Sequence, residues 1–260
     1  MKEYLLCFDV DGTLRDNVHH QVSESTLLAL KRLKKENYRM IIASGRGIDS
    51  LQKTGLMELI EWDGYVCNNG QDLLNQDGHS LFHASLEKES VEQTIAIADR
   101  LGYAVVLKGR PRIITREPDE YVKESQRFFN NDIPKVSDYH GQEVDAMIVY
   151  GPKGYDYAPF LAVPHINVLP GESTYADLTI KGISKATGIR YFMDMFGLDQ
   201  FMAFGDSLND VEMFKHADIS VAMGQGNEKL KQMATYVTDT IENDGIYKAC
   251  QHFQLWEGEE

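Results

Sequence analysis

The sequence has few cysteines and little positive charge. Its three cysteines are odd in number and far apart, which argues against a disulfide framework and against a CxxC metal site. The 26 Lys and Arg residues are outnumbered by 40 Asp and Glu residues, and the formal net charge of −14 disfavours a general binder of nucleic acid or of anionic membranes. The cysteine pattern fits a reducing compartment.

Long hydrophobic runs are also missing. No apolar stretch approaches the roughly 20 residues that cross a bilayer. The first apolar segment, Tyr4 to Phe8, is too short for a signal peptide and is followed at once by Asp9. We therefore predict a cytoplasmic protein that does not contact membranes. The hydrophobic share of 43% and the charged share of 25% are those of an ordinary folded chain.

Several short apolar runs have the continuous pattern of buried parallel strands, at residues 4–8, 40–43, 201–204 and 219–223. Between the first two, residues 25–35 carry leucines at helical spacing with charges on the opposite face. Strand, helix and strand in this order predict an α/β fold with a doubly wound parallel-sheet (Rossmann-like) core.

The pattern of the chain changes after the second of these runs. Asn69-Gly70 and Asp77-Gly78 are tight-turn dipeptides, typical of a hairpin at a domain junction. Short helices and strands follow in a different order, and the core pattern resumes near Lys185. We predict a core formed by residues 1–82 and 181–260, interrupted by an inserted α+β domain of residues 83–180.

Two carboxylates follow the first predicted strand directly. Asp9 and Asp11, in Asp9-Val10-Asp11-Gly12-Thr13, would lie at the carboxyl edge of the sheet, where open α/β sheets bind ligands. Residues two apart project to the same side of an extended chain. In a closed site such a pair can serve as a nucleophile and an acid/base. Taken alone, the segment is equally well explained as a loop turn.

Three further segments carry polar groups at strand ends or at a helix start. Ser44-Gly45-Arg46 offers a hydroxyl and backbone amides for phosphate oxygens, although a helix N-cap has similar residues. Lys185 near a helix start would be rationalised by a bound anion, and otherwise is a solvated surface lysine. Asp206 and Asp210 follow another strand, and hard oxygen ligands suit Mg²⁺, whereas a turn with a helix cap is the alternative.

In this order, the four segments resemble the motifs of the haloacid dehalogenase-like phosphatase superfamily. More narrowly, the chain resembles the Cof-type sugar-phosphate phosphatases, which have an α/β cap inserted after the second motif. The resemblance spans nearly the whole chain and includes Gly182-Ile183-Ser184-Lys185. Two positions depart from the family pattern: Ser44 stands where Thr is common, and Gln225-Gly226-Asn227 replaces the more usual Asn-Ala.

The resemblance implies a Mg²⁺-dependent phosphatase for small phosphate monoesters such as sugar phosphates. Asp9 would attack phosphorus and form an aspartyl-phosphate, and Asp11 would protonate the leaving group and then activate water. Mg²⁺ would be bound by the Asp9 carboxylate, the Asp11 backbone carbonyl and Asp206. The phosphate would contact Ser44, Gly45, Asn209 and Lys185. Lys185 would also be a catalytic residue. Thr13 would orient Asp11, and Asp210 would anchor Lys185.

The sequence leaves open what the inserted domain binds, and it allows alternatives to a phosphatase. The basic residues of the insert either face water or meet an anionic leaving group, with Arg110 or Arg112 as the candidates for specificity. A phosphomutase or phosphotransferase would share the first half-reaction, and a non-catalytic phosphate-binding regulator is the non-enzyme alternative. We expect a small-molecule phosphate ester as the partner, and a monomer or a weak homo-oligomer.

Overall fold

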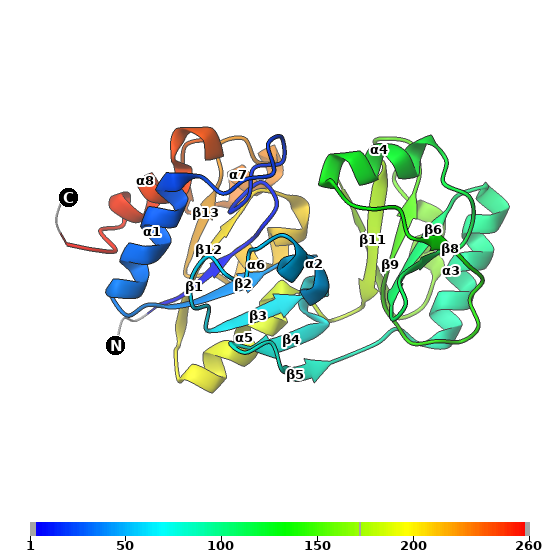
Figure 1. The fold of residues 1–260 in the computed structure, drawn as a ribbon, viewed down its shortest axis with the longest axis horizontal. Coiled ribbons are helices and arrows are strands. Elements are labelled where there is room, and N and C mark those ends of the chain that lie inside the picture. The colour runs from blue at the N-terminus through cyan, green and yellow to red at the C-terminus, as the bar shows by residue number, and fades with distance from the viewer. Residues whose placement is uncertain (1–3, 172, 258–260) are drawn as a thin grey trace. The chain divides into compact units, whose positions relative to one another are not determined.

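The computed structural model describes residues 4–171 and 173–257, and the chain forms two compact units (Figure 1). The first unit combines the chain up to Phe82 with the chain from Ser184 onward, and the second is His83–Ile183. Among the described residues, no helix combines the length and the apolar character needed to cross a bilayer. The two units are described separately below.

An eight-stranded sheet with the order β14-β13-β12-β1-β2-β3-β4-β5 forms the centre of the first unit. The strands from β14 to β3 are parallel to their neighbours, and β4 is antiparallel to β3. Their bounds are β1 Tyr4–Phe8, β2 Arg39–Ala43, β3 Gly64–Cys67, β4 Asp72–Asn75, β5 Ser80–His83, β12 Gln200–Gly205, β13 Ile219–Ala222 and β14 Tyr236–Val237. The chain runs outward from β1 through β2 and β3, and later outward through β12 and β13 on the other side. The predicted doubly wound parallel sheet is therefore confirmed.

Helices cover both faces of this sheet, as the alternation of the strand side chains requires. Leu6 and Phe8 of β1 belong to a core that also contains Leu30 and Ile246, whereas Leu5 and Cys7 belong to the core on the opposite face. The first core includes residues of α1 (Glu24–Lys35), α2 (Ile48–Lys53) and α8 (Gly245–His252), and the second includes residues of α5 (Lys185–Phe196), α6 (Val211–His216) and α7 (Glu228–Met233). Short 3₁₀ turns at Asn68–Gly70, Leu208–Asp210 and Ile241–Asn243 connect these elements.

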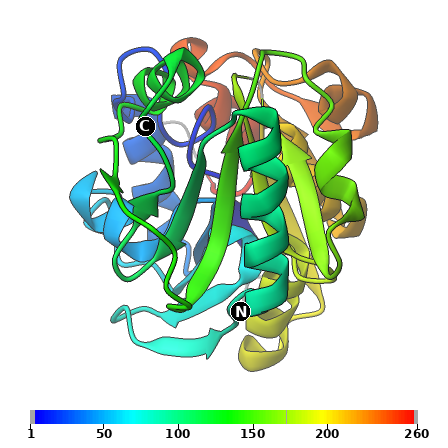
Figure 2. The same cartoon turned by 90° about the vertical axis from the view of Figure 1, so that its right-hand side faces the viewer.

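The second unit contains a six-stranded sheet with the order β10-β11-β9-β6-β7-β8 (Figure 2). Its pairs are antiparallel except β7 with β8. Its elements are α3 Lys88–Leu101, β6 Val105–Gly109, β7 Ile113–Ile114, α4 Glu120–Phe129, β8 Lys135–Val136, β9 Val144–Tyr150, a 3₁₀ turn at Ala158–Ala162, β10 Ile166–Pro170 and β11 Tyr175–Ile180. This arrangement confirms the α+β character predicted for the insert.

The two helices of the second unit pack in different clusters of its core. Val91 and Ala98 of α3 pack with Val105 and Leu107 of β6. Val122 of α4 packs with Val106, the residue of β6 that lies between those two. Because successive strand residues point to opposite faces, α3 and α4 lie against opposite faces of the sheet.

Candidate active site

The residues that follow three parallel strands gather at the carboxyl edge of the first unit's sheet. Asp9 follows β1, Ser44 follows β2 and Asp206 follows β12. The sheet hydrogen bonds continue to these positions, because the amide of Asp9 donates to the carbonyl of Phe204 (2.9 Å) and the amide of Ser44 to that of Val66 (2.8 Å). Parallel strands end on the same side, so the chain brings the three side chains to one edge.

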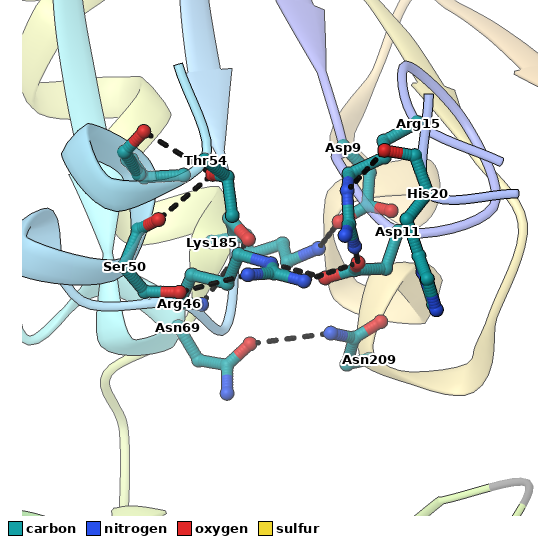
Figure 3. A network of polar contacts seen from close by, with 12 residues as sticks. Asp9, Asp11, Arg15, His20, Arg46, Ser50, Thr54, Asn69, Lys185 and Asn209 are labelled. Carbon is teal, nitrogen blue, oxygen red and sulfur yellow. Dashed lines mark hydrogen bonds and ion pairs between the residues drawn. The ribbon is translucent and has the colours of Figure 1, made fainter. Parts of the chain in front are cut away.

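Lys185 is the first residue of α5 and is buried, with only 1% of its surface exposed. Its Nζ donates to Oδ1 of Asp9 at 2.6 Å (Figure 3). The same Nζ donates to Oδ1 of Asp210 at 2.7 Å. Burial alone would lower the pKa of Lys185, but the charges of Asp210 and Asp9 outweigh it and raise the pKa above its usual value. The lysine is therefore a charged group inside the site and not a solvated surface residue.

The charge state of Asp9 is set by competing effects. Burial raises the pKa of Asp9 to about 7, although the nearby Lys185 acts to lower it; the charge of Asp210 adds to the rise. Desolvation penalises the ionised form of a carboxyl, and a neighbouring cation favours it. A divalent cation beside Asp9 would therefore favour the ionised carboxylate.

Asp210 links the lysine to the loop that carries Asp206. Its Oδ1 accepts from Lys185, while its Oδ2 accepts the backbone amides of Asp206 (3.0 Å) and Ser207 (3.1 Å). The Asp210 side chain is completely buried. Both oxygens of this carboxylate thus have partners, and it fixes the position of two other groups of the site.

Three carboxylates form a group that could hold a divalent cation. Oxygens of Asp9, Asp206 and Asp210 all lie within 4.8 Å of one another, and all three residues are buried. Carboxylate oxygens are the donors that Mg²⁺ and similar hard cations prefer. Gly12 allows the loop after β1 to approach this group, because a Cβ at its φ of +82° would lie 2.1 Å from Oδ2 of Asp206. The donor set fits a hard divalent cation.

The carboxylate of Asp11 does not belong to that group, and it contacts two arginines instead (Figure 3). Nε of Arg46 donates to its Oδ2 and Nη2 to its Oδ1, both at 2.7 Å, and Nη1 of Arg15 lies 3.4 Å from Oδ1. Thr13, expected to orient Asp11, has a buried hydroxyl with no hydrogen bond among the described residues. The structure therefore gives the orienting contact to the arginines.

Three of the residues expected to contact phosphate, Ser44, Gly45 and Asn209, lie next to Asn69. Oγ of Ser44 is buried and accepts from the amide of Arg46 (3.1 Å), and Gly45 lies close enough to Asn69 that a Cβ there would be 3.3 Å from its side chain. Asn209 donates from Nδ2 to Oδ1 of Asn69 (3.4 Å). Asn69 itself has a φ of +56°, in the left-handed region that asparagine tolerates. The sequence predicts Asn69 in a tight turn at the domain junction, a segment that also belongs to the family resemblance, and assigns it no contact in the site.

A family model for haloacid dehalogenase-like hydrolases matches residues 6–250. The chain belongs to this hydrolase family. The resemblance of its motifs to the superfamily and to its Cof-type phosphatases is thereby confirmed, and so, at the level of the family, is the prediction of a phosphatase enzyme.

Solved structures and a curated relative agree with this assignment. The hydrolase superposes on the subclass IIB sugar phosphatase BT4131 with a TM-score of 0.87 and 31% identity, over 97% of this chain and 100% of the other. It superposes on BT1666 of Bacteroides thetaiotaomicron, a phosphatase of the same superfamily, with a TM-score of 0.87 and 28% identity, over 97% and 96%. It is also 26% identical to the 5-amino-6-(5-phospho-D-ribitylamino)uracil phosphatase YitU of Bacillus subtilis, over 97% of this chain and 98% of that one.

Residues 225–227, where the hydrolase departs from the family pattern, contact the two loops that carry the acidic residues of the site. Nε2 of Gln225 donates to the carbonyl of Gly12 (2.5 Å), and its Oε1 accepts from the amide of Ile241 (3.0 Å). The amide of Asn227 donates to the carbonyl of Asp206 (2.7 Å). This segment therefore supports both loops that carry the acidic residues.

The basic residues of the second unit are partly engaged with neighbours of their own sheet. Nζ of Lys108 lies 2.9 Å from Oδ1 of Asp177. Arg110 is exposed at the turn between β6 and β7. Arg112 is exposed at the same turn, so both candidates for specificity face solvent.

Proposed function

We propose that this hydrolase is a Mg²⁺-dependent phosphatase that releases phosphate from small monoesters through an aspartyl-phosphate at Asp9. The proposal rests chiefly on one observation: the buried carboxylate of Asp9, directly after strand β1, lies 2.6 Å from the Lys185 ammonium and belongs to a compact group of three aspartates. A nucleophile, a fixed positive charge and hard oxygen donors at one sheet edge suit phosphoryl transfer.

In the first half-reaction, an oxygen of Asp9 attacks phosphorus and the alkoxide leaves. Lys185 is positioned to offset charge on the transferring group, with the Ser44 hydroxyl, the Gly45 amide and Asn209 as further phosphate contacts. Asp9, the Asp11 carbonyl and Asp206 would hold Mg²⁺, with Asp210 supporting Lys185; the bound ion would supply charge neutralisation for a phosphate dianion among carboxylates. Asp11 acts as the acid/base of the two steps.

We further propose that the unit His83–Ile183, close to the residues 83–180 expected as an insert, is a cap that selects the leaving group. Sugar and polyol phosphates are the substrate class we favour. The subclass IIB sugar phosphatase and the ribitylamino-uracil phosphatase among its relatives act on such esters by their names. A cytoplasmic location and a monomeric or weakly oligomeric state remain predictions.

The test is phosphate release from sugar phosphates, nucleotides and p-nitrophenyl phosphate, with Mg²⁺ and with a chelator. We expect Mg²⁺-dependent release that falls at least about 10³-fold in Asp9→Asn. Asp199→Asn, an exposed aspartate of the same unit, is the matched control and should leave the rate unchanged. Release that survives chelation would overturn the metal requirement, and release that survives Asp9→Asn would overturn the nucleophile. Absence of release from every ester would favour a mutase or a phosphate-binding regulator.

A further inference from the structure

The guanidinium of Arg46 is directed at Asp11, a residue from a different loop 35 positions away in the sequence. Two of its nitrogens each meet a different oxygen of the carboxylate at 2.7 Å, which is a bidentate contact. Such a contact fixes the plane of a carboxylate as well as its position, whereas a lysine would fix only a point. Arg46 therefore restrains both the place and the rotation of the Asp11 carboxylate.

Arg46 is itself held in place. Its third guanidinium nitrogen, Nη1, donates to Oγ of Ser50 in α2 at 2.8 Å, and its side chain is 7% exposed. Its carbonyl accepts from the amide of Asn68 (2.9 Å), and its amide donates to Ser44. Every nitrogen of the guanidinium thus has an acceptor from this chain. These hydrogen bonds to Asp11 and Ser50 fix the position of the guanidinium.

Arg15 is a weaker second contact from the loop of Asp11. Its Nη1 lies 3.4 Å from the carboxylate, and its Nε donates to the carbonyl of His20 at 3.2 Å (Figure 3). Arg46 makes two contacts with this carboxylate at 2.7 Å, so Arg46 is the principal partner of Asp11.

We infer that Arg46 is a positioning residue that holds the Asp11 carboxylate as the proton acceptor for the second half-reaction. This inference rests on the proposed function. In that step a bond forms between a water oxygen and phosphorus, the bond from phosphorus to the Asp9 oxygen breaks with its electron pair returning to Asp9, and the water proton passes to an oxygen of Asp11. A carboxylate with a fixed plane keeps one oxygen toward the water.

The consequence is a specific kinetic pattern with p-nitrophenyl phosphate, whose leaving group departs without protonation. Loss of Arg46 should slow the hydrolysis of the aspartyl-phosphate more than its formation. In Arg46→Met we expect a rapid burst of p-nitrophenol close to one equivalent per enzyme, followed by a steady rate lowered about 10²-fold. Arg46→Lys should be intermediate, and Ser50→Ala should shift in the same direction by a smaller factor.

The controls separate positioning from other roles of Arg46. Arg190→Met removes an arginine that is 69% exposed and should leave both phases unchanged. A raised KM without a burst would mean that Arg46 binds phosphate, and an equal fall in both phases would mean a purely structural role; either result overturns the inference. If Arg46→Met does not fold, Arg46→Lys and Ser50→Ala decide by the same burst measurement. A wild type inactive toward every ester, or insensitive to Asp9→Asn, would instead contradict the proposed function.

Discussion

Lys185 and Asp210 meet at 2.7 Å, and neither side chain has any exposed surface. The second oxygen of Asp210 accepts two backbone amides of the loop that carries Asp206. One carboxylate thus compensates a buried ammonium and fixes a loop at the same time. Its loss would leave a buried charge with one partner fewer, which is among the more costly changes inside a protein.

We expect Asp210→Ala to lower the free energy of unfolding by about 3–5 kcal/mol. The measurement is urea unfolding followed by circular dichroism. Asp239→Ala removes an aspartate that is 57% exposed and pairs with a surface lysine, so its unfolding midpoint should match that of the wild type. Equal midpoints for Asp210→Ala and Asp239→Ala would contradict the role assigned to Asp210.

Gly12 and Gly182 offer a matched pair for testing the cation site. Both have a positive φ, but a Cβ on Gly12 would lie 2.1 Å from Asp206 whereas a Cβ on Gly182 would have no neighbour within 4 Å. Both alanine variants should share the cost of backbone strain, about 1 kcal/mol. Only Gly12→Ala should displace Asp206 and weaken Mg²⁺ activation, by about 10- to 100-fold. Titration of activity with Mg²⁺ measures this, and similar activation constants for both variants would exclude the proposed contact.

We expect Asp63 to make a pH-dependent contribution to the free energy of unfolding. Burial acts to raise its pKa, but hydrogen bonds from Lys34, the amide of Met40 and Arg39 outweigh burial and hold the pKa below its usual value. The folded protein therefore binds this proton more weakly than the unfolded chain. The resulting stabilisation is present above the unfolded pKa of about 4 and is lost as pH falls through the folded pKa.

The corresponding variant is Asp63→Ala, which should cost about 2 kcal/mol at pH 7. The difference from the wild type should shrink as the pH is lowered below about 4, because the wild-type carboxyl then becomes protonated as well. Urea unfolding over this pH range measures the difference. Asp194→Ala, whose carboxylate is 72% exposed, should show almost no cost at any pH; a pH-independent cost for Asp63→Ala would show that the charge is not responsible.

The three cysteines should be unreactive in the folded protein. Cys7, Cys67 and Cys250 are buried, and burial raises the pKa of each thiol. Because the thiolate is the reactive form, Ellman's reagent should label none of them in the native state and all of them in urea. Rapid labelling of one thiol in the native protein would indicate local opening near that residue.

The position of the site at one edge of the sheet could be predicted from the strand pattern alone. Polar residues directly after buried parallel strands must meet at one edge, so the order of Asp9, Ser44 and Asp206 along the chain already indicates their proximity. The burial of Lys185 was harder to predict, since a single lysine near a helix start is usually solvated. Lys185 could be assigned to the site because it stands third in an ordered set of four motifs. Its local sequence alone does not indicate this.

Contacts between loops could not be predicted from the pattern. The bidentate contact of Arg46 with Asp11 depends on how two loops 35 residues apart close over each other, and no periodicity encodes that. The same holds for the left-handed Asn69 beside Asn209. In the second unit, β8 has only two residues, too short to give a detectable alternation.

The division of the first unit between two distant segments has a consequence for its biosynthesis. Asp9 and Lys185 are 176 residues apart, and β1 pairs with β12, which the ribosome makes after the whole insert. At a translation rate of about 5–20 residues per second, Lys185 is synthesised roughly 9–35 s after Asp9. During that interval one edge of β1 has no partner strand, a state that invites chaperone binding or misassociation. A ribosome that stops before Lys185 therefore releases a chain in which Asp9 has no ammonium group to pair with.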